Sequence, residues 1–353
     1  MQEVPTAKRM RIASNAACDE ESSEQGKDLA DSECSDEDVP QFPPPPAWLP
    51  LHSFKGEAAE ALEGLVAAIE MSGLQLEGPF SQDMLGVPTK GHLARAIKDL
   101  RQELLHGHGV ALVRGMHWPS DDALRRTALL LFAALLGGRT VRQSADLKEF
   151  VADVKVPDAD IPTTWRGYRN ALAQMPHTDS LCPGSCDAIL MLCIKQADEG
   201  GESLFVPAER VHKVVMEEKP ALYSRLASPW PWRHGEEWLE DWGEQEVLLE
   251  GAPVLSVASS GIRHCVQFGK ILRKNIEAGI RARAAADLGK DMSAEDVDAL
   301  DFLEEVLNRK DMQMQWRLEA GDLLVMNNWA WLHGRTAFDE HQSRHMLRVW
   351  QRW

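Results

Sequence analysis

Many short β-strand candidates fill the second half of the chain, and this pattern constrains the fold more than any other feature of the sequence. The candidates are rich in large apolar residues, and Gly or Pro turns separate most of them. Short strands joined by such turns favour antiparallel sheets over a parallel sheet. We therefore predict an α+β, mainly β fold, a double-stranded β-helix or jelly-roll barrel of the cupin kind. The predicted strands cover residues 110–113, 188–194, 202–206, 253–258, 322–326 and 344–350.

Helices are expected on both sides of the first strand. Residues 91–106 repeat Leu and Ile at helical spacing, and residues 120–136 begin with a Ser-Asp-Asp cluster suited to an N-cap and stop at a Gly-Gly pair. This order predicts a sheet extended at one edge and braced by helices on one face. Further helices are expected at about 207–219, 272–288 and 293–308.

The first 47 residues have a different composition. They hold eleven Asp or Glu against four Lys or Arg, with few large apolar residues and a run of four prolines near the end. Such a segment buries too little apolar surface to offset its ordering entropy, so we predict a disordered acidic tail. Residues 8–11 could be a weak nuclear-import patch and residues 32–38 an acidic phosphoacceptor site, although an inert tail is the simpler interpretation. Residues 48–353 are expected to form one domain, with the jelly-roll core at about 105–353.

Composition argues against several classes of protein. The net charge of -17 disfavours nucleic acid as a partner, because binding phosphates requires a basic surface. No apolar run reaches about 18 residues, so no membrane span is expected and we predict an intracellular, cytoplasmic protein, with the nucleus as the alternative. Cys182 and Cys186 form a lone C-x3-C, which is weak evidence for zinc. Oligomeric state is left open.

A candidate metal site combines three residues that are distant in sequence. His177 and Asp179 project to one side if their segment is extended, and His333 lies 156 residues downstream of His177. Two imidazoles and one carboxylate leave three positions of an octahedral Fe(II) open, as in non-haem iron oxygenases. Taken singly, the H-x-D triplet could be a surface loop and His333 a core histidine.

Two arginines follow in the last predicted strand. Alternation puts Arg344 and Arg348 on one face of this strand. If that face lines the interior, each guanidinium needs an anion, and a carboxylate suits it best. The distal carboxylate of 2-oxoglutarate suits Arg344, and Ser203, after the Gly200-Gly201 turn, could add a hydroxyl hydrogen bond. An edge strand with both arginines in solvent is the alternative.

The sequence resembles the taurine dioxygenase-like (TauD/TfdA) oxygenases, which depend on Fe(II) and 2-oxoglutarate. Four motifs carry the resemblance in order over residues 80–353: HTD at 177–179, GGES at 200–203, LHGRTAF at 332–338 and RHMLRVW at 344–350. The resemblance implies iron ligation by His177, Asp179 and His333, and it implies binding of 2-oxoglutarate by Arg344 and Ser203. Many relatives have Thr at the serine position. The resemblance also implies O2 as the oxidant and a small organic molecule as the substrate.

Substrate residues are predicted from position alone. We name Arg348, Asn170 and Trp331 as candidates, Arg348 because it lacks a dedicated anion once Arg344 is assigned to the co-substrate. An anionic or zwitterionic substrate would supply that anion, unless a protein carboxylate does. Residues 207–250 are expected to be a lid, and a surface loop that packs its tryptophans on the barrel is the alternative. The tryptophans in question are Trp230, Trp232, Trp238 and Trp242.

Three other functions compete with hydroxylation. A halogenase needs an open position where the carboxylate would sit, and Asp179 occupies that position. A zinc hydrolase could use the same three ligands, but Arg344 and Ser203 would then have no evident task. A degenerate barrel that acts as a binding module would not need a complete set of ligands.

Overall fold

The structure is a computed structural model that describes residues 45–72, 91–143, 150–156, 170–179, 186–233, 248–257, 264–285 and 292–353. Residues 1–44 of the predicted tail lie outside these ranges. Trp48, the first residue after the predicted tail, packs on Phe205 with ring centroids 5.2 Å apart. Among the described residues, no helix is both long and apolar enough to cross a membrane.

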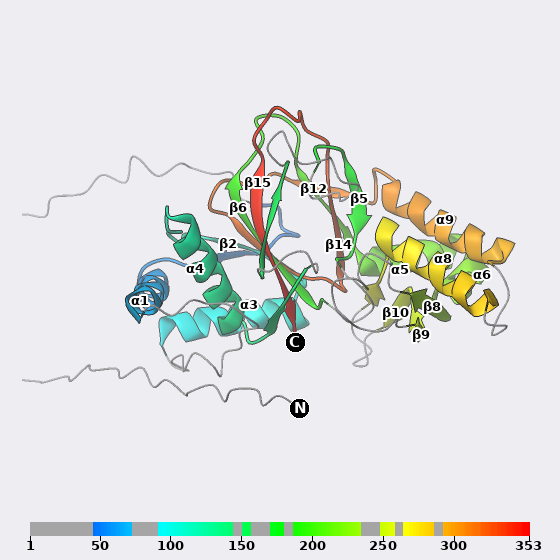
Figure 1. Cartoon of the computed structure of the whole chain (residues 1–353), viewed down its shortest axis with the longest axis horizontal. Coiled ribbons are helices and arrows are strands. Elements are labelled where there is room, and N and C mark those ends of the chain that lie inside the picture. The colour runs from blue at the N-terminus through cyan, green and yellow to red at the C-terminus, as the bar shows by residue number, and fades with distance from the viewer. Residues whose placement is uncertain are drawn as a thin grey trace, which may run out of the picture.

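Two antiparallel-rich sheets form the centre of the molecule (Figure 1). The larger sheet has seven strands in the order β1-β2-β13-β6-β15-β3, and β4 also pairs with β15. The smaller sheet has the order β12-β7-β14-β5. The first sheet contains β1 (Leu51–Ser53), β2 (Val110–Arg114), β3 (Arg139–Val141), β4 (Val151–Lys155), β6 (Ala188–Lys195), β13 (Leu323–Asn327) and β15 (His345–Arg352). The second contains β5 (Gln174–His177), β7 (Ser203–Pro207), β12 (Met314–Trp316) and β14 (Trp331–Arg335).

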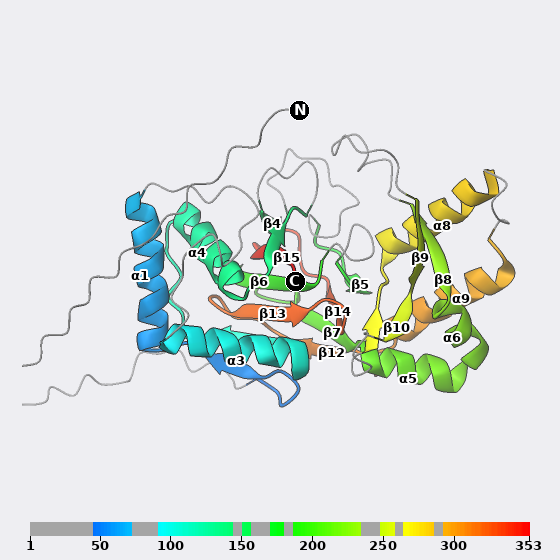
Figure 2. The ribbon, with the colours of Figure 1, turned by 90° about the horizontal axis from the view of Figure 1, so that it is seen from below.

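Helices cover the outer side of the larger sheet. They are α1 (Glu57–Ser72), α3 (His92–His106) and α4 (Asp122–Leu135), and Figure 2 shows them together on one side of the strands. Asp121 caps α4 by accepting a hydrogen bond from the backbone N–H of Leu124 at 2.9 Å. The predicted helices at 91–106 and 120–136 are therefore confirmed as α3 and α4, and they brace one face of the sheet as expected.

A second helical layer lies beyond the smaller sheet (Figures 1 and 2). Its apolar cluster includes side chains from the helices and from the strands next to them. Ser293 begins the last helix with a capping box to Asp296. The layer contains α5 (Ala208–Glu218), α6 (Pro220–Leu226), α8 (Lys270–Ala285), α9 (Ala294–Asn308), β8 (Pro229–Arg233), β9 (Leu248–Pro253), β10 (Leu255–Val257) and β11 (His264–Val266).

Residues 207–250, the expected lid, belong to this second layer where they are described. Helix α6 packs against α9, and Trp230 and Trp232 are each only 1% exposed within the same apolar cluster. Trp238 and Trp242 lie outside the described residues. The two described tryptophans are therefore packed in the body of the protein, and a lid function for the segment stays a prediction.

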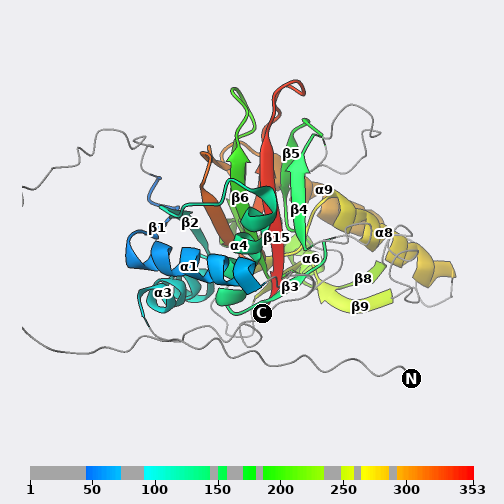
Figure 3. The ribbon, with the colours of Figure 1, turned by 60° about the vertical axis from the view of Figure 1, so that its left-hand side comes forward.

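Alternation along the strands separates the two faces of each sheet. On β15, Leu347 and Val349 pack toward the helices, whereas Met346 and Trp350 join a cluster between the sheets. Figure 3 shows β15 between β6 and β4, the strands that it pairs with. The prediction of a jelly-roll with bracing helices is confirmed, although among the described strands the two sheets do not join into a closed barrel.

Candidate active site

The three predicted metal ligands converge between the sheets. His333 on β14 is directly opposite His177 on β5 in the strand register, and Asp179 follows β5 by two residues. The Nε2 atoms of His177 and His333 lie 3.6 and 3.7 Å from the two oxygens of Asp179. These distances are too long for hydrogen bonds but short enough for one ion to be shared. In the described part of the chain, this is the only cluster of three such residues able to hold a metal.

The hydrogen bonding and burial of the two imidazoles suit metal ligands. The Nδ1 atom of His177 is 2.9 Å from the carbonyl oxygen of Met175 and donates to it, which orients Nε2 toward the other ligands. Burial lowers the pKa of His333 to about 3, so its ring is neutral. Its Nδ1 atom is buried and has no hydrogen-bond partner among the described residues.

Asp179 is fixed through both its backbone and its carboxylate. Asn328 accepts a hydrogen bond from the Asp179 N–H at 2.8 Å and donates to the Asp179 carbonyl oxygen at 2.5 Å. Arg348 and Trp350 donate to Oδ2 of the carboxylate, each at 2.8 Å. Burial opposes ionisation, but the Arg348 cation outweighs it and holds the pKa of Asp179 well below its usual range. The carboxylate is thus ionised, and the set of two nitrogens and one oxygen fits Fe(II).

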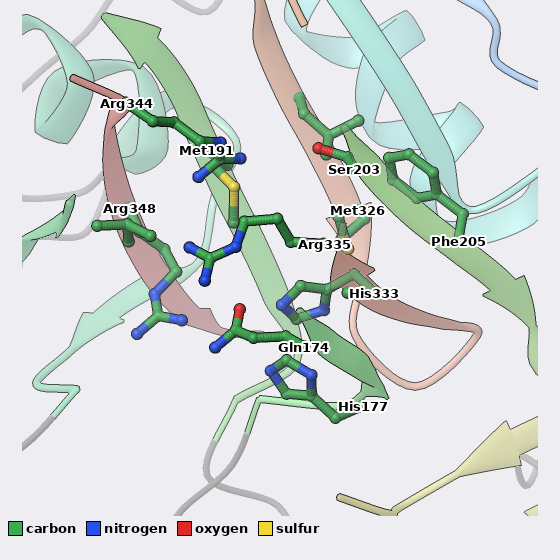
Figure 4. Close-up of a pocket in the computed structure, with 13 residues that line it drawn as sticks. Gln174, His177, Met191, Ser203, Phe205, Met326, His333, Arg335, Arg344 and Arg348 are labelled. Atoms are coloured by element: carbon green, nitrogen blue, oxygen red, sulfur yellow. The ribbon is translucent and has the colours of Figure 1, made fainter. Parts of the chain in front are cut away.

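A cavity opens beside the two histidines (Figure 4). It has an empty volume of about 420 Å³, including its opening to solvent. Both sheets contribute to it, since β15 of the larger sheet supplies Arg348, with Arg344 directly before that strand, and the smaller sheet supplies Ser203. Its lining residues are Val154, Gln174, His177, Met191, Ser203, Phe205, Leu324, Met326, His333, Gly334, Arg335, Arg344 and Arg348.

Arg344 has the surroundings of an anion-binding residue. Its Nε atom donates to Gln196 Oε1 and to the Gly201 carbonyl oxygen, both at 3.1 Å, and no ion pair with a carboxylate is found for it in the described ranges. Burial lowers its pKa to about 10, so the guanidinium stays charged at neutral pH. Gly201 has a φ of 69°, and a Cβ there would lie 2.9 Å from Arg344 Cδ, which explains the glycine in this turn.

Arg348 has a protein anion, contrary to the premise of its predicted substrate role. Besides its bond to Asp179, its Nε atom donates to Gln143 Oε1 at 2.6 Å. The need for a substrate anion at this residue therefore disappears, and contact with substrate remains only a prediction. The structure contains the alternative given in the sequence analysis, in which a protein carboxylate is the anion that pairs with Arg348.

The other two substrate candidates do not line the cavity. Asn170 Oδ1 accepts a hydrogen bond from the Leu172 N–H at 3.1 Å, while the Asn170 carbonyl oxygen accepts one from Arg335 at 2.7 Å. Trp331 lies between the sheets, where its Nε1 donates to the His108 carbonyl oxygen at 2.6 Å. A substrate contact for either residue stays untested.

Gln174 lines the cavity and was not predicted from the sequence. Arg335 pairs with Gln174 and His333 with His177, so β5 has one residue more than β14 between the two pairs. This bulge turns Gln174 to the same side as His177, and Figure 4 shows its amide between the histidines and Arg348. Strict alternation would have directed it away, so no simple sequence pattern reveals it. Trp350 could have been found, because it shares the face of Arg348.

Comparisons with known proteins agree with this geometry. Residues 72–350 match the family described as "Taurine catabolism dioxygenase TauD, TfdA family". The FR-33289 synthase of Streptomyces rubellomurinus is 24% identical over 303 residues, which cover 84% of this chain and 83% of that protein. The crystal structure of asparagine oxygenase is similar with a TM-score of 0.55 at 16% identity, covering 85% of this chain and 92% of that one.

The same asparagine oxygenase in complex with Fe(II), 2S,3S-3-hydroxyasparagine and succinate gives a TM-score of 0.54, again at 16% identity and with coverage of 85% and 92%. At this identity the two structures establish the fold alone. The family match spans well over half of the chain and includes all three predicted metal ligands. This chain therefore belongs to the TauD, TfdA family and is an Fe(II)- and 2-oxoglutarate-dependent dioxygenase.

Proposed function

We propose that the enzyme hydroxylates a small anionic or zwitterionic organic molecule and releases succinate and CO2. The observation that carries the proposal is the charge of the cavity. Arg335, Arg344 and Arg348 line it, and no Asp or Glu is among the lining residues in the part of the chain that the structure describes. Buried cations attract anions strongly because the surroundings screen them little.

Each residue has a distinct task in this proposal. His177, Asp179 and His333 would hold Fe(II), while Arg344 with Ser203 would bind the distal carboxylate of 2-oxoglutarate. When bound, the iron, 2-oxoglutarate and O2 supply the oxidising power for attack on a C–H bond. The chain itself orients the co-substrate and the substrate and keeps them apart from bulk water. Met191, Phe205 and Met326 give the cavity its apolar part.

The charge balance favours an acidic group on the substrate. Burial lowers the pKa of Arg335 to about 9 and that of Arg344 to about 10, and both values leave the groups protonated at neutral pH. The two carboxylates of 2-oxoglutarate would meet the iron and Arg344, and Asp179 already faces Arg348. The arginines that line the cavity give it a positive potential, in which a substrate carboxylate or a similar acid is favoured.

The named relatives support a small substrate. Asparagine oxygenase is named for an amino acid, and its complex contains a hydroxylated amino acid. We therefore infer an amino acid or a related acid, with the Gln174 amide available to a polar group of the substrate.

The test has two stages. Anaerobic addition of Fe(II) and 2-oxoglutarate should produce a visible metal-to-ligand charge-transfer band, which neither a zinc hydrolase nor a binding module would give. Small acids and their neutral amides are then screened for stimulation of 2-oxoglutarate decarboxylation, measured as succinate. Stimulation by acids and not by the matched amides is expected. Stimulation by neutral compounds alone would disprove the substrate class but not the enzyme class.

A further inference from the structure

One oxygen of the Asp179 carboxylate receives two hydrogen bonds from the same strand. Arg348 Nη1 and Trp350 Nε1 both donate to Oδ2 at 2.8 Å. These residues are two apart on β15, so alternation puts both side chains on the face toward the metal ligands. The Oδ1 atom lies 3.6 Å from His177 Nε2, on the side of the other metal ligands.

Arg348 is itself held in place by Gln143. Arg348 Nε donates to Gln143 Oε1 at 2.6 Å, and Gln143 Nε2 returns a hydrogen bond to the Arg348 carbonyl oxygen, also at 2.6 Å. All four side chains are buried, with exposed fractions of 4% for Gln143 and Trp350 and 6% for Asp179 and Arg348. A buried network of this kind has few alternative arrangements.

We propose that Arg348 and Trp350 are positioning residues that commit Asp179 to bind the metal through Oδ1 alone. With two donors on Oδ2, one of them charged, that oxygen has little capacity left for a metal bond. One-oxygen binding by Asp179 leaves three coordination positions open, the number that the co-substrate and O2 require. Arg348 then serves the metal ligand and is not the residue that recognises the acidic group of the substrate. This inference goes beyond the proposed function and does not depend on the substrate class.

The first test replaces Trp350 with Phe, which removes one N–H donor and keeps an aromatic ring. The matched control is Trp329→Phe, because Trp329 Nε1 also donates to a carboxylate at 2.8 Å, that of Asp187, which is not a metal ligand. The dissociation constant for Co(II) is measured without co-substrate, from the visible absorption of the bound metal. We expect Trp350→Phe to raise the dissociation constant for Co(II) about tenfold, which is the lower end of the loss in metal affinity when a hydrogen-bond partner of a metal ligand is removed. Trp329→Phe should leave it unchanged.

A second pair of variants addresses the guanidinium. Arg348→Lys keeps the charge but loses the fork that joins Gln143 to Asp179. Its control is Arg114→Lys. Arg114 forms an ion pair with Asp322, with N···O distances of 2.6 and 2.9 Å, and neither residue is a metal ligand. Both variants should lower the melting temperature of the metal-free protein, but only Arg348→Lys should weaken Co(II) binding.

Two results would overturn the proposal. One is unchanged Co(II) affinity in both Trp350→Phe and Arg348→Lys. The other is an equal loss of affinity in each variant and its control, since the effect would then reflect general stability. Because no substrate or co-substrate is added, neither result bears on the proposed function, and failure of the substrate screen would leave the metal affinities as they are.

Discussion

The two faces of the larger sheet differ in what they do, although the same strands build both. Toward α1, α3 and α4 the sheet presents aliphatic side chains such as Leu347 and Val349, which are fully buried. Toward the smaller sheet it presents Arg344, Arg348 and Trp350, and each of these makes a specific hydrogen bond. The outer face needs only apolar volume, whereas the inner face needs defined partners.

The smaller sheet repeats this division. On β14, Leu332 joins the apolar cluster of the second helical layer, while His333 and Arg335 line the cavity. On both sheets, alternate side chains along a strand thus either pack in an apolar cluster or line the cavity. Substitutions on the inner faces should change metal or co-substrate binding more than stability, and substitutions on the outer faces should do the reverse.

The largest effect is expected for Asp179→Ala on the inner face. The variant loses one of three metal ligands and leaves the buried Arg348 cation without its carboxylate partner. We expect no measurable succinate formation, and we expect the metal-free protein to lose about 3–5 kcal/mol of stability in urea. His177→Ala, which should also abolish turnover, is the comparison because it removes a neutral ligand. Undiminished turnover in either variant would refute the metal assignment.

Leu347→Ala should have the next largest effect, on stability alone. This leucine is fully buried on the outer face of β15, where its side chain points away from the cavity that its neighbour Arg348 lines. Loss of its side chain should cost about 2–5 kcal/mol in the free energy of unfolding. Co(II) affinity at a temperature where the variant remains folded should match that of the parent protein. A weakened metal site would show that the two faces are coupled.

Alternation explains why much of this fold could be predicted from the sequence. The segments at 188–194, 322–326 and 344–350 became β6, β13 and β15, and all belong to the larger sheet. The iron ligands could also be predicted, because their spacing and types are restrictive. The predicted strand at 253–258 was observed instead as the end of β9 followed by β10, with Val254 between them.

Other parts depend on contacts that a linear pattern does not contain. Helix α1 was not predicted, and neither was β5, which is short and includes Pro176. The partner of Arg348 could not be chosen from the sequence, because Asp179 is 169 residues away and was already assigned to iron. Gln174 required knowledge of a bulge, since β-bulges depend on pairing between strands.

A moderate effect is expected for Arg344→Lys on the inner face. Lysine keeps the charge but lacks the planar fork that matches a carboxylate. The apparent 2-oxoglutarate requirement should rise about tenfold if about 1.5 kcal/mol of hydrogen bonding is lost. Succinate formation is measured against 2-oxoglutarate concentration, with Arg114→Lys as the control because Arg114 does not line the cavity. An unchanged 2-oxoglutarate requirement would mean that another residue binds the distal carboxylate of the co-substrate.

The smallest effect concerns His212, a buried histidine outside the two sheets. Its Nδ1 is 3.1 Å from the Tyr223 hydroxyl and its Nε2 is 3.0 Å from the Cys265 carbonyl oxygen. Burial lowers the pKa of His212, and the neighbouring His264 lowers it further, against the hydrogen bond to Cys265. The unfolded chain therefore binds a proton more readily than the folded chain.

The sign of the pH dependence follows from this lowered pKa. The stability that neutral His212 contributes is present above the unfolded pKa of 6.5 and is lost as the pH falls below it. Metal-free protein should thus lose more stability between about pH 7.5 and about pH 5.5 than a His212→Gln variant does. Urea unfolding at both pH values measures this difference, because every other titratable group is common to both proteins and its contribution cancels. Equal losses would mean that a neutral His212 contributes nothing to the stability of the helical layer.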